Sequence, residues 1–139
     1  MNNIGTNYKS LARYEKAEAL YRQTLETCRR VSGPEQPGTL KMMTSLAGTY
    51  FSLTKYEQAE ALYHQTVEIQ ERVLGPEHLD TLMSMYNLAV SCARLGKEAP
   101  AYALLAKTLE ISRRVLGPEH PLTLSLIRAV PPVDHRPGR

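Results

Sequence analysis

Histidine and cysteine are the residue types in this chain that most readily serve as metal ligands or catalytic groups. His78 and His120 each follow the triplet Gly-Pro-Glu, and Gln36 stands at the matching place after an earlier copy of that triplet. Glutamine can act neither as a general base nor as a good zinc ligand, so we interpret both histidines as turn residues. Cys28 and Cys92 are far apart and occupy different places in the pattern. They predict neither a metal site nor a disulfide framework.

Other catalytic arrangements are equally weak in the sequence. The pair Gly96-Lys97 lacks the remaining glycine and hydroxyl residues of a phosphate-binding loop. The carboxylates are spread along the outer faces of predicted helices, so they do not form an acid–base pair. We therefore predict that the chain is not an enzyme and has no cofactor and no metal ion.

Composition and charge limit the partners. The formal net charge is +3 in 139 residues, and Lys and Arg form no dense block. Nucleic-acid binding is therefore not expected. No apolar run approaches the roughly 20 residues of a membrane-spanning helix, and the first residues do not resemble a signal peptide. With two cysteines and no disulfide pattern, these features predict a soluble, cytoplasmic protein without membrane contact.

Internal repetition dominates the chain and must position whatever function it has. Gly33-Pro34-Glu35 recurs as Gly75-Pro76-Glu77 and as Gly117-Pro118-Glu119, each step being 42 residues. The segment 14–21 recurs almost unchanged as 56–63, and 98–105 is a looser third copy. A fixed period of this length is typical of a solenoid of stacked helical units.

Each period is predicted to contain two antiparallel helices. Apolar residues recur every three or four positions in both halves, and the glycine of each triplet suits the left-handed residue that ends a helix. Small residues, such as Ala47 and Ala89, are expected where the two helices cross. Thr39, Thr81 and Thr123, with Asp80 beside Thr81, are expected to cap the next helix. Glu26–Arg30, Glu68–Arg72 and Glu110–Arg114 are expected as i,i+4 ion pairs on the solvent face.

These residues resemble the tetratricopeptide repeat, in the 42-residue form found in kinesin light chains. The positions that carry the resemblance in one copy are Leu46, Ala47, Tyr50, Thr54, Tyr56, Ala59, Tyr63 and Thr66, and in the next Leu88, Ala89, Cys92, Gly96, Glu98, Ala101, Leu105 and Thr108. The resemblance runs from about residue 1 to 127. It implies an all-α fold, a right-handed superhelical solenoid of antiparallel helical hairpins.

The repeat register divides the chain into one array, 1–129, and a tail, 130–139, predicted to be disordered. The array comprises a partial unit (1–32), two units (39–74 and 81–116) and a broken unit (121–129) that stops before Pro131-Pro132. The third copy lacks the aromatic residues of the family pattern at Cys92 and Glu98. Pro100 falls in a first turn, where proline is tolerated.

The resemblance also implies a binding surface, because the first helix of each hairpin lines the concave face of such solenoids. By register, the inward residues include Asn3, Thr6, Lys9, Lys41, Thr44, Ser45, Tyr86, Asn87, Val90 and Arg94. This strip has basic points and no carboxylate. Asn3 and Asn87 fall where an asparagine in these repeats hydrogen-bonds a peptide backbone. The implied function is that of a scaffold whose concave face binds an extended, acidic or neutral segment of a partner protein.

Two alternatives remain open from the sequence. The concave residues could be ordinary solvated surface, with no partner. The chain could instead be a structural oligomerisation fragment, self-associating end to end through uncapped helix faces, and belong to a larger signalling protein with a kinase or nucleotide-binding domain elsewhere.

Overall fold

The computed structural model describes residues 3–130, with side chains described from Ser10 onward. This part of the chain is all-α. Its six helices are α1 (Asn3–Val31), α2 (Pro37–Ser52), α3 (Tyr56–Val73), α4 (Leu79–Arg94), α5 (Glu98–Val115) and α6 (Pro121–Ala129). The all-α class is therefore confirmed. The predicted tail lies outside the described residues, apart from Val130.

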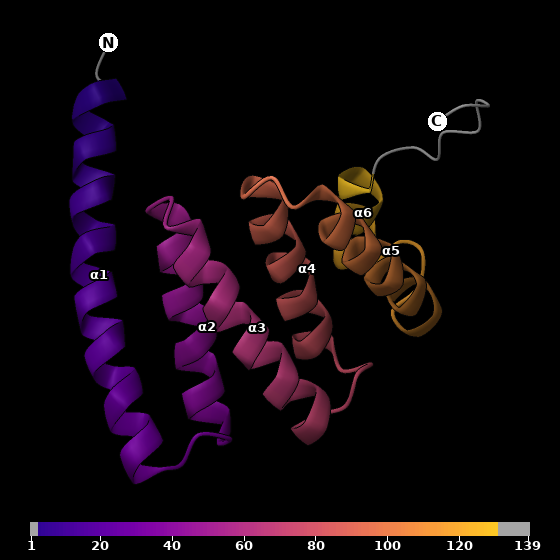
Figure 1. Ribbon diagram of the computed structural model, residues 1–139, viewed down its shortest axis with the longest axis horizontal. Coiled ribbons are helices and arrows are strands. Elements are labelled where there is room, and N and C mark those ends of the chain that lie inside the picture. The colour runs from indigo at the N-terminus through magenta and orange to yellow at the C-terminus, as the bar shows by residue number, and fades with distance from the viewer. Residues whose placement is uncertain (1–2, 131–139) are drawn as a thin grey trace.

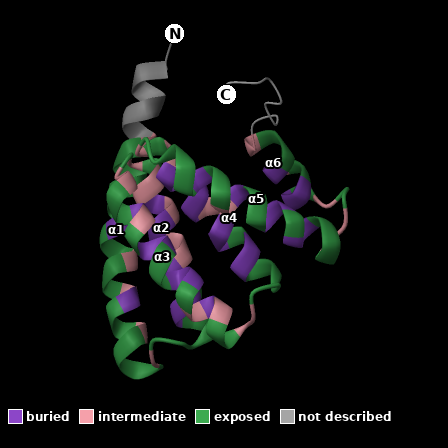
Figure 2. Ribbon diagram, turned by 45° about the vertical axis from the view of Figure 1, so that its right-hand side comes forward, coloured by how far each residue is buried: buried purple, intermediate pink, exposed green. Residues whose placement is uncertain are grey.

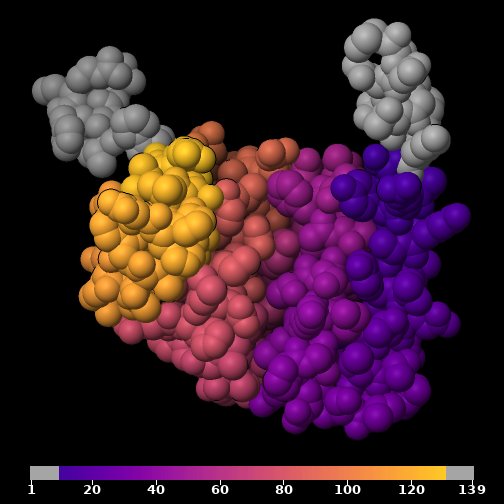
Figure 3. All heavy atoms as spheres, turned by 180° about the vertical axis from the view of Figure 1, so that it is seen from behind, coloured from indigo at the N-terminus to yellow at the C-terminus, as the bar shows by residue number. Residues whose placement is uncertain are grey.

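The helices follow one another across the molecule in chain order, from α1 at one end to α6 at the other (Figure 1). Extensive contacts join each helix to the next one, which is the arrangement of a solenoid built from local pairs. The rear view shows the same order on the surface, where colour changes steadily from the N-terminal to the C-terminal segments (Figure 3). The hairpins α2–α3 and α4–α5 are the two complete units.

The core is one continuous layer between successive helices (Figure 2). Ala47, Ala59, Ala89 and Ala101 are fully buried, and this allows the paired helices to approach closely. The larger fully buried side chains are Met43, Leu82, Met85 and Leu126. The close-crossing role predicted for the alanines agrees with their complete burial.

The Gly-Pro-Glu glycines end helices as predicted. Gly75 has a φ of 100°, and its N–H donates to the carbonyl of Gln70, which closes the last turn of α3. Gly117 does the same after α5 with a φ of 96°. Only glycine adopts this conformation without steric cost, and the proline that follows stops the helix from continuing.

The first period differs from the prediction of two helices, because α1 runs unbroken for 29 residues. In the complete hairpins the turn contains a residue in the left-handed region, Thr54 (φ 59°) or Gly96 (φ 80°). The matching residue of the first period is Ala12. Alanine pays about 1–2 kcal/mol in that region and is the strongest helix former, so the helix continues through this point.

The residues that cap α4 and α6 are the two histidines, which corrects the prediction that threonines cap these helices. His78 Nδ1 accepts a hydrogen bond from the N–H of Asp80 (3.0 Å). His120 Nδ1 accepts one from the N–H of Leu122 (3.1 Å). Gln36 occupies the same position before α2 and makes no such bond. The turn role expected of the histidines is thus an N-cap.

The three threonines are instead buried between helices. Thr39 Oγ1 donates to a backbone carbonyl of the preceding turn (2.6 Å), and Thr123 Oγ1 lies 2.6 Å from Ser112 Oγ. Thr81 and Gln70 occupy the positions that match Thr123 and Ser112, and their side-chain oxygens are buried without a hydrogen-bond partner among the described residues. Burial explains the conflict with the prediction: a side chain that faces the core cannot reach the free N–H groups of a helix end.

Two of the three arginines predicted to form i,i+4 pairs, Arg72 and Arg114, reach across to the preceding unit instead, and Arg30 forms no ion pair among the described residues. Arg72 pairs with Glu35, and Arg114 Nη2 lies 2.8 Å from Glu77 Oε2. The glutamates are those of the Gly-Pro-Glu triplets, which therefore connect consecutive units. Glu35 and Glu77 lie in the turns between units, within reach of these arginines, and the described residues show no ion pair from either arginine to Glu68 or Glu110.

A second series of ion pairs also connects consecutive units. Lys55 Nζ lies 2.7 Å from Glu18 Oε1, and Lys97 Nζ lies 2.9 Å from Glu60 Oε1. In both series the partners are 37 residues apart. These contacts repeat with the scaffold and hold the units in register.

Candidate concave binding site

The face formed by α2, α4 and α6 is hollowed at three adjoining places. One hollow of about 460 Å³ lies between the first halves of α2 and α4 and includes Lys41, Thr44 and Met83. A second, of about 340 Å³, lies between their second halves. A third, of about 320 Å³, lies between α4 and α6. Helices of this kind present side chains at i, i+3, i+4 and i+7 on one face, so α4 contributes to all three hollows.

Asn87 is the residue that joins the three hollows. Its side chain lines each of them, and Tyr86 and Met83 each line two. The Asn87 carbonyl accepts a hydrogen bond from Ser91 Oγ, but no hydrogen bond found among the described residues engages its side-chain amide. A half-exposed amide that both donates and accepts can bind the N–H and C=O groups of an extended backbone.

Aromatic rings hold Arg94 at the edge of the second hollow. Its guanidinium carbon lies 5.2 Å from the ring centre of Phe51 and 5.8 Å from that of Tyr56, and its Nη1 donates to the Tyr56 hydroxyl (3.2 Å). The two rings themselves meet edge to face, with centres 5.0 Å apart. Cation–π contacts orient the guanidinium while leaving it exposed and without a carboxylate partner in the described part of the chain.

Tyr63 forms the floor of the second hollow. The side chain is buried, and desolvation raises the pKa of its phenol to about 12. Gly48 lies directly above it: a Cβ at this position would be 3.5 Å from the Tyr63 hydroxyl. The absence of a side chain at Gly48 therefore keeps this hollow open, whereas the matching residue of the next unit is Val90.

The structure brings together six of the ten predicted site residues on this face: Lys41, Thr44, Tyr86, Asn87, Val90 and Arg94. Ser45 is half-buried on α2 and lines none of the three hollows. Asn3, Thr6 and Lys9 lie in the first turns of α1, and their side chains fall outside those the structure describes.

One feature of the predicted strip needs correction. Asp80, in the first turn of α4, lines the hollow between α2 and α4. The face formed by α2, α4 and α6 therefore carries a carboxylate near one end, opposite the Arg94 end. The sequence register placed Asp80 among capping residues and did not count the first turn of α4 as part of the groove.

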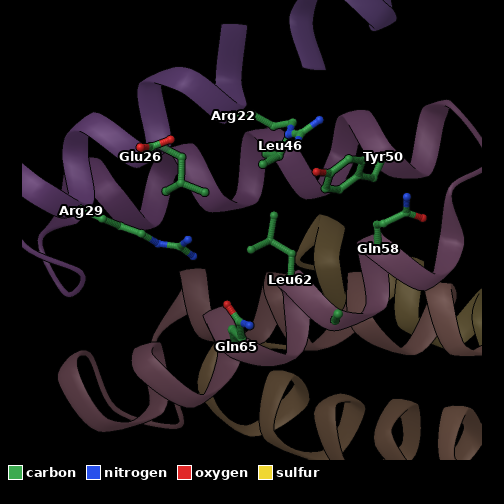
Figure 4. A pocket seen from close by; sticks show the side chains of 10 residues that line it. Arg22, Glu26, Arg29, Leu46, Tyr50, Gln58, Leu62 and Gln65 are labelled. Carbon is green, nitrogen blue, oxygen red and sulfur yellow. The ribbon is translucent and has the colours of Figure 1, made fainter. Parts of the chain in front are cut away.

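Another hollow, of about 450 Å³, lies on the other side of α2, between α1 and α3 (Figure 4). Leu46 and Leu62 form its apolar part, and Arg22, Glu26 and Arg29 reach in from α1. The repeat pattern predicted that Glu26 lies on the solvent face and gave no sign of a hollow. The lining residues come from α1, α2 and α3, so the hollow is a property of packing and not of any one segment.

The described residues hold no group of three or more His, Cys, Asp or Glu side chains close enough to bind a metal ion. Both cysteines are free thiols. Burial raises the pKa of the Cys92 thiol to about 11, and the Glu60 carboxylate that accepts its hydrogen bond (3.3 Å) contributes to the rise. This thiol is therefore poorly ionised near neutral pH. None of the helices in the described range has the length and apolar character needed to span a bilayer.

Comparison with known proteins gives consistent matches to one family. The family model for the tetratricopeptide repeat matches residues 1–63 and 39–104. The crystal structure of a putative kinesin light chain of Podosopora anserina, built of nearly identical TPR-like repeats, superposes with a TM-score of 0.79 at 25% identity. A variant of the same protein gives a TM-score of 0.80 at the same identity.

In both cases the match covers 93% of this chain and 64% of the other, so the chain spans less than two thirds of the length of these relatives. BtubC (BKLC) of P. vanneervenii has the same fold, with a TM-score of 0.72 at 22% identity over 85% of this chain and 46% of that one. Among curated proteins, no match is found.

Proposed function

Because this chain belongs to the tetratricopeptide repeat family, whose members generally mediate protein–protein interaction, we propose that its concave face binds an extended segment of a partner protein. The observation that carries the proposal is the continuity of the three hollows at Asn87. An extended chain presents a backbone amide every 3.3 Å or so, and a central amide side chain flanked by hollows can bind backbone and side chains together.

Charge favours a neutral or acidic segment. Arg94 and Lys41 are exposed at this face without carboxylate partners in the described range, and Asp80 offsets them at one end only. A carboxylate of the partner near Arg94 would find a guanidinium already oriented by Phe51 and Tyr56. Two free thiols support our further proposal of a reducing, cytoplasmic setting.

A displayed library of random peptides, selected against the chain, would supply a binding sequence for measurement. Asn87→Ala and Arg94→Glu are each expected to weaken that peptide about tenfold, a loss of about 1.4 kcal/mol, by fluorescence anisotropy. Gln65→Ala is the matched control, because Gln65 lines the hollow on the other side of α2. Full affinity in both groove variants, or an equal loss in the control, would contradict the concave site.

Gly48→Val tests the same groove by steric exclusion. A valine here reproduces the residue of the next unit, so the helix should tolerate it, and its methyl groups would enter the hollow above Tyr63. Peptide affinity is expected to fall while the thermal midpoint does not. Gly38→Ala, on the same helix with no atom within 4 Å of the added Cβ, controls for the loss of glycine and should bind normally.

A further inference from the structure

The last helix, α6, exposes a face that is buried in the helices equivalent to it. Leu124 and Ile127 are each 40% exposed. The residues that match Ile127 at the 42-residue period, Met43 and Met85, are 1% exposed, and those that match Leu124 are buried as well. Whereas α2 and α4 each pack between two helices, α6 has extensive contacts with α5 alone among the helices that the structure describes. The extra exposure therefore marks the face that a following helix covers in the other units.

The first helix has the reciprocal property. Leu20 of α1 is 59% exposed, while the matching Leu62 of α3 is 8% exposed. Tyr21 and Thr24 are half-buried, although the residues at their positions in α3 and α5 are buried. Within residues 3–130, α3 and α5 pack between two helices and α1 has extensive contacts with α2 alone. This face of α1 is therefore the one that a preceding helix covers in the other units.

We propose that these two faces bind each other between copies of the chain, so that α1 of one copy packs on α6 of another in the register of the repeat. Residues 14–31 correspond to the second helix of a hairpin, and α6 corresponds to a first helix. Together they would form the hairpin that neither forms alone. Figure 1 places them at opposite ends of the molecule, so one copy cannot satisfy both faces by itself.

The charge at the two ends is complementary in the same register. Glu35–Arg72 and Glu77–Arg114 connect consecutive units, and the next glutamate of this series is Glu119. In a following unit, the partner of Glu119 would be the arginine at the repeat position of Arg72 and Arg114. In the first unit of a second copy, the residue at this position is Arg30. Glu119 and Arg30 are both exposed. The contact joins two different surfaces at opposite ends of the molecule, so it adds further copies head to tail rather than closing a dimer between identical surfaces.

Sedimentation velocity of the full chain tests this from micromolar to near-millimolar concentration. The expected result is an average mass that rises continuously past two copies. A mass that stays at one copy throughout, or that stops at two, would overturn the proposal.

Charge reversal identifies the contact. Glu119→Arg alone and Arg30→Glu alone are each expected to lower the association constant roughly fivefold or more, because each places like charges opposite each other. An equimolar mixture of the two variants should associate more strongly than either variant alone, since a junction between Glu119 of one variant and Arg30 of the other again pairs Glu with Arg. A purely structural role of either residue cannot produce this recovery. A mixture that stays as weak as its components would exclude the register.

Ile127→Glu tests the apolar part of the same face. Because Ile127 is already partly exposed, folding should survive, as circular dichroism would verify, while association falls about tenfold or more. Glu57→Arg on α3, an exposed position away from both ends, is the control and should associate normally. Unchanged association of Ile127→Glu would contradict the assignment of this face.

Discussion

Two histidines show how a residue that repeats with a scaffold can serve local folding, here as the N-cap of a helix. His78 and His120 accept hydrogen bonds at Nδ1 from N–H groups in the first turns of α4 and α6. A helix start has free N–H groups, and the neutral imidazole supplies the lone pair that satisfies one of them. Their recurrence at 42 residues was enough to predict a turn role from the sequence. The bond itself could not be predicted, because it depends on the side-chain rotamer.

The His78 cap gives a direct stability prediction. His78→Ala should lower the free energy of unfolding by about 1 kcal/mol, and His78→Asn should retain most of it, because asparagine is among the preferred capping residues. Urea denaturation would measure both. Gln36→Ala is the matched control, since Gln36 holds the same position without a capping bond, and should change stability by less than about 0.5 kcal/mol. Equal losses at the two positions would contradict the cap.

Glu60 connects two units through Lys97 and Cys92. The hydrogen bond from Lys97 is the largest of the effects that lower the pKa of Glu60 below its ordinary value of 4.5, and the same bond raises the pKa of Lys97 above 10.5. The Cys92 thiol donates to the same carboxylate. The sequence indicated only exposed charges at these positions, since the partners are 37 residues apart.

This cluster predicts a defined pH dependence. Around pH 4.5 and below, the unfolded chain binds more protons at this residue than the folded chain, so the stabilisation from Glu60 is complete above that pH and is lost as pH falls through the lowered pKa. The contribution of Lys97 is complete below pH 10.5 and is lost as pH rises through its raised pKa. Glu60→Gln should therefore lower the free energy of unfolding most between about pH 4.5 and pH 10.5, as denaturation at several pH values would show. Glu110→Gln, an exposed change on α5, should show no such window.

At the scale of elements, the residue at the left-handed position of the hairpin turn contributes to whether a period forms one helix or two. Gly96 accepts a φ of 80° at no steric cost, Thr54 accepts 59° with strain, and Ala12 remains helical. The periodicity correctly predicted the helices of the complete units, because apolar spacing specifies them. The prediction of two helices was wrong in the first period, because a repeat pattern does not take into account the helix propensity of the residues at the turn.

Opposite substitutions at the two turns test this interpretation. Thr54→Gly should stabilise the chain by about 0.5–1 kcal/mol, because relief of strain exceeds the added entropy of the unfolded glycine. Gly96→Ala should destabilise it by about 1 kcal/mol. Chemical denaturation of both variants would measure the two effects. A loss of stability in Thr54→Gly would show that the threonine is not strained.

At the scale of the whole molecule, the sequence predicted the family and the stacking of units, and it placed six groove residues on one face. It could not predict the hollow between α1 and α3 or the presence of Asp80 in the groove. Both involve residues of different helices, so they depend on how neighbouring helices pack. Periodicity specifies which side of a helix is apolar. The size of a hollow between two helices depends on the side chains that both helices contribute to the contact.

The two series of ion pairs between units have a consequence for how such a chain changes in length over generations. Each pair joins a residue to another 37 positions away, and each pattern returns after 42. An in-frame duplication of one period in the gene would therefore insert a hairpin whose charged partners already stand at the correct distance. Arrays with these contacts can be lengthened or shortened by recombination without new compensating mutations.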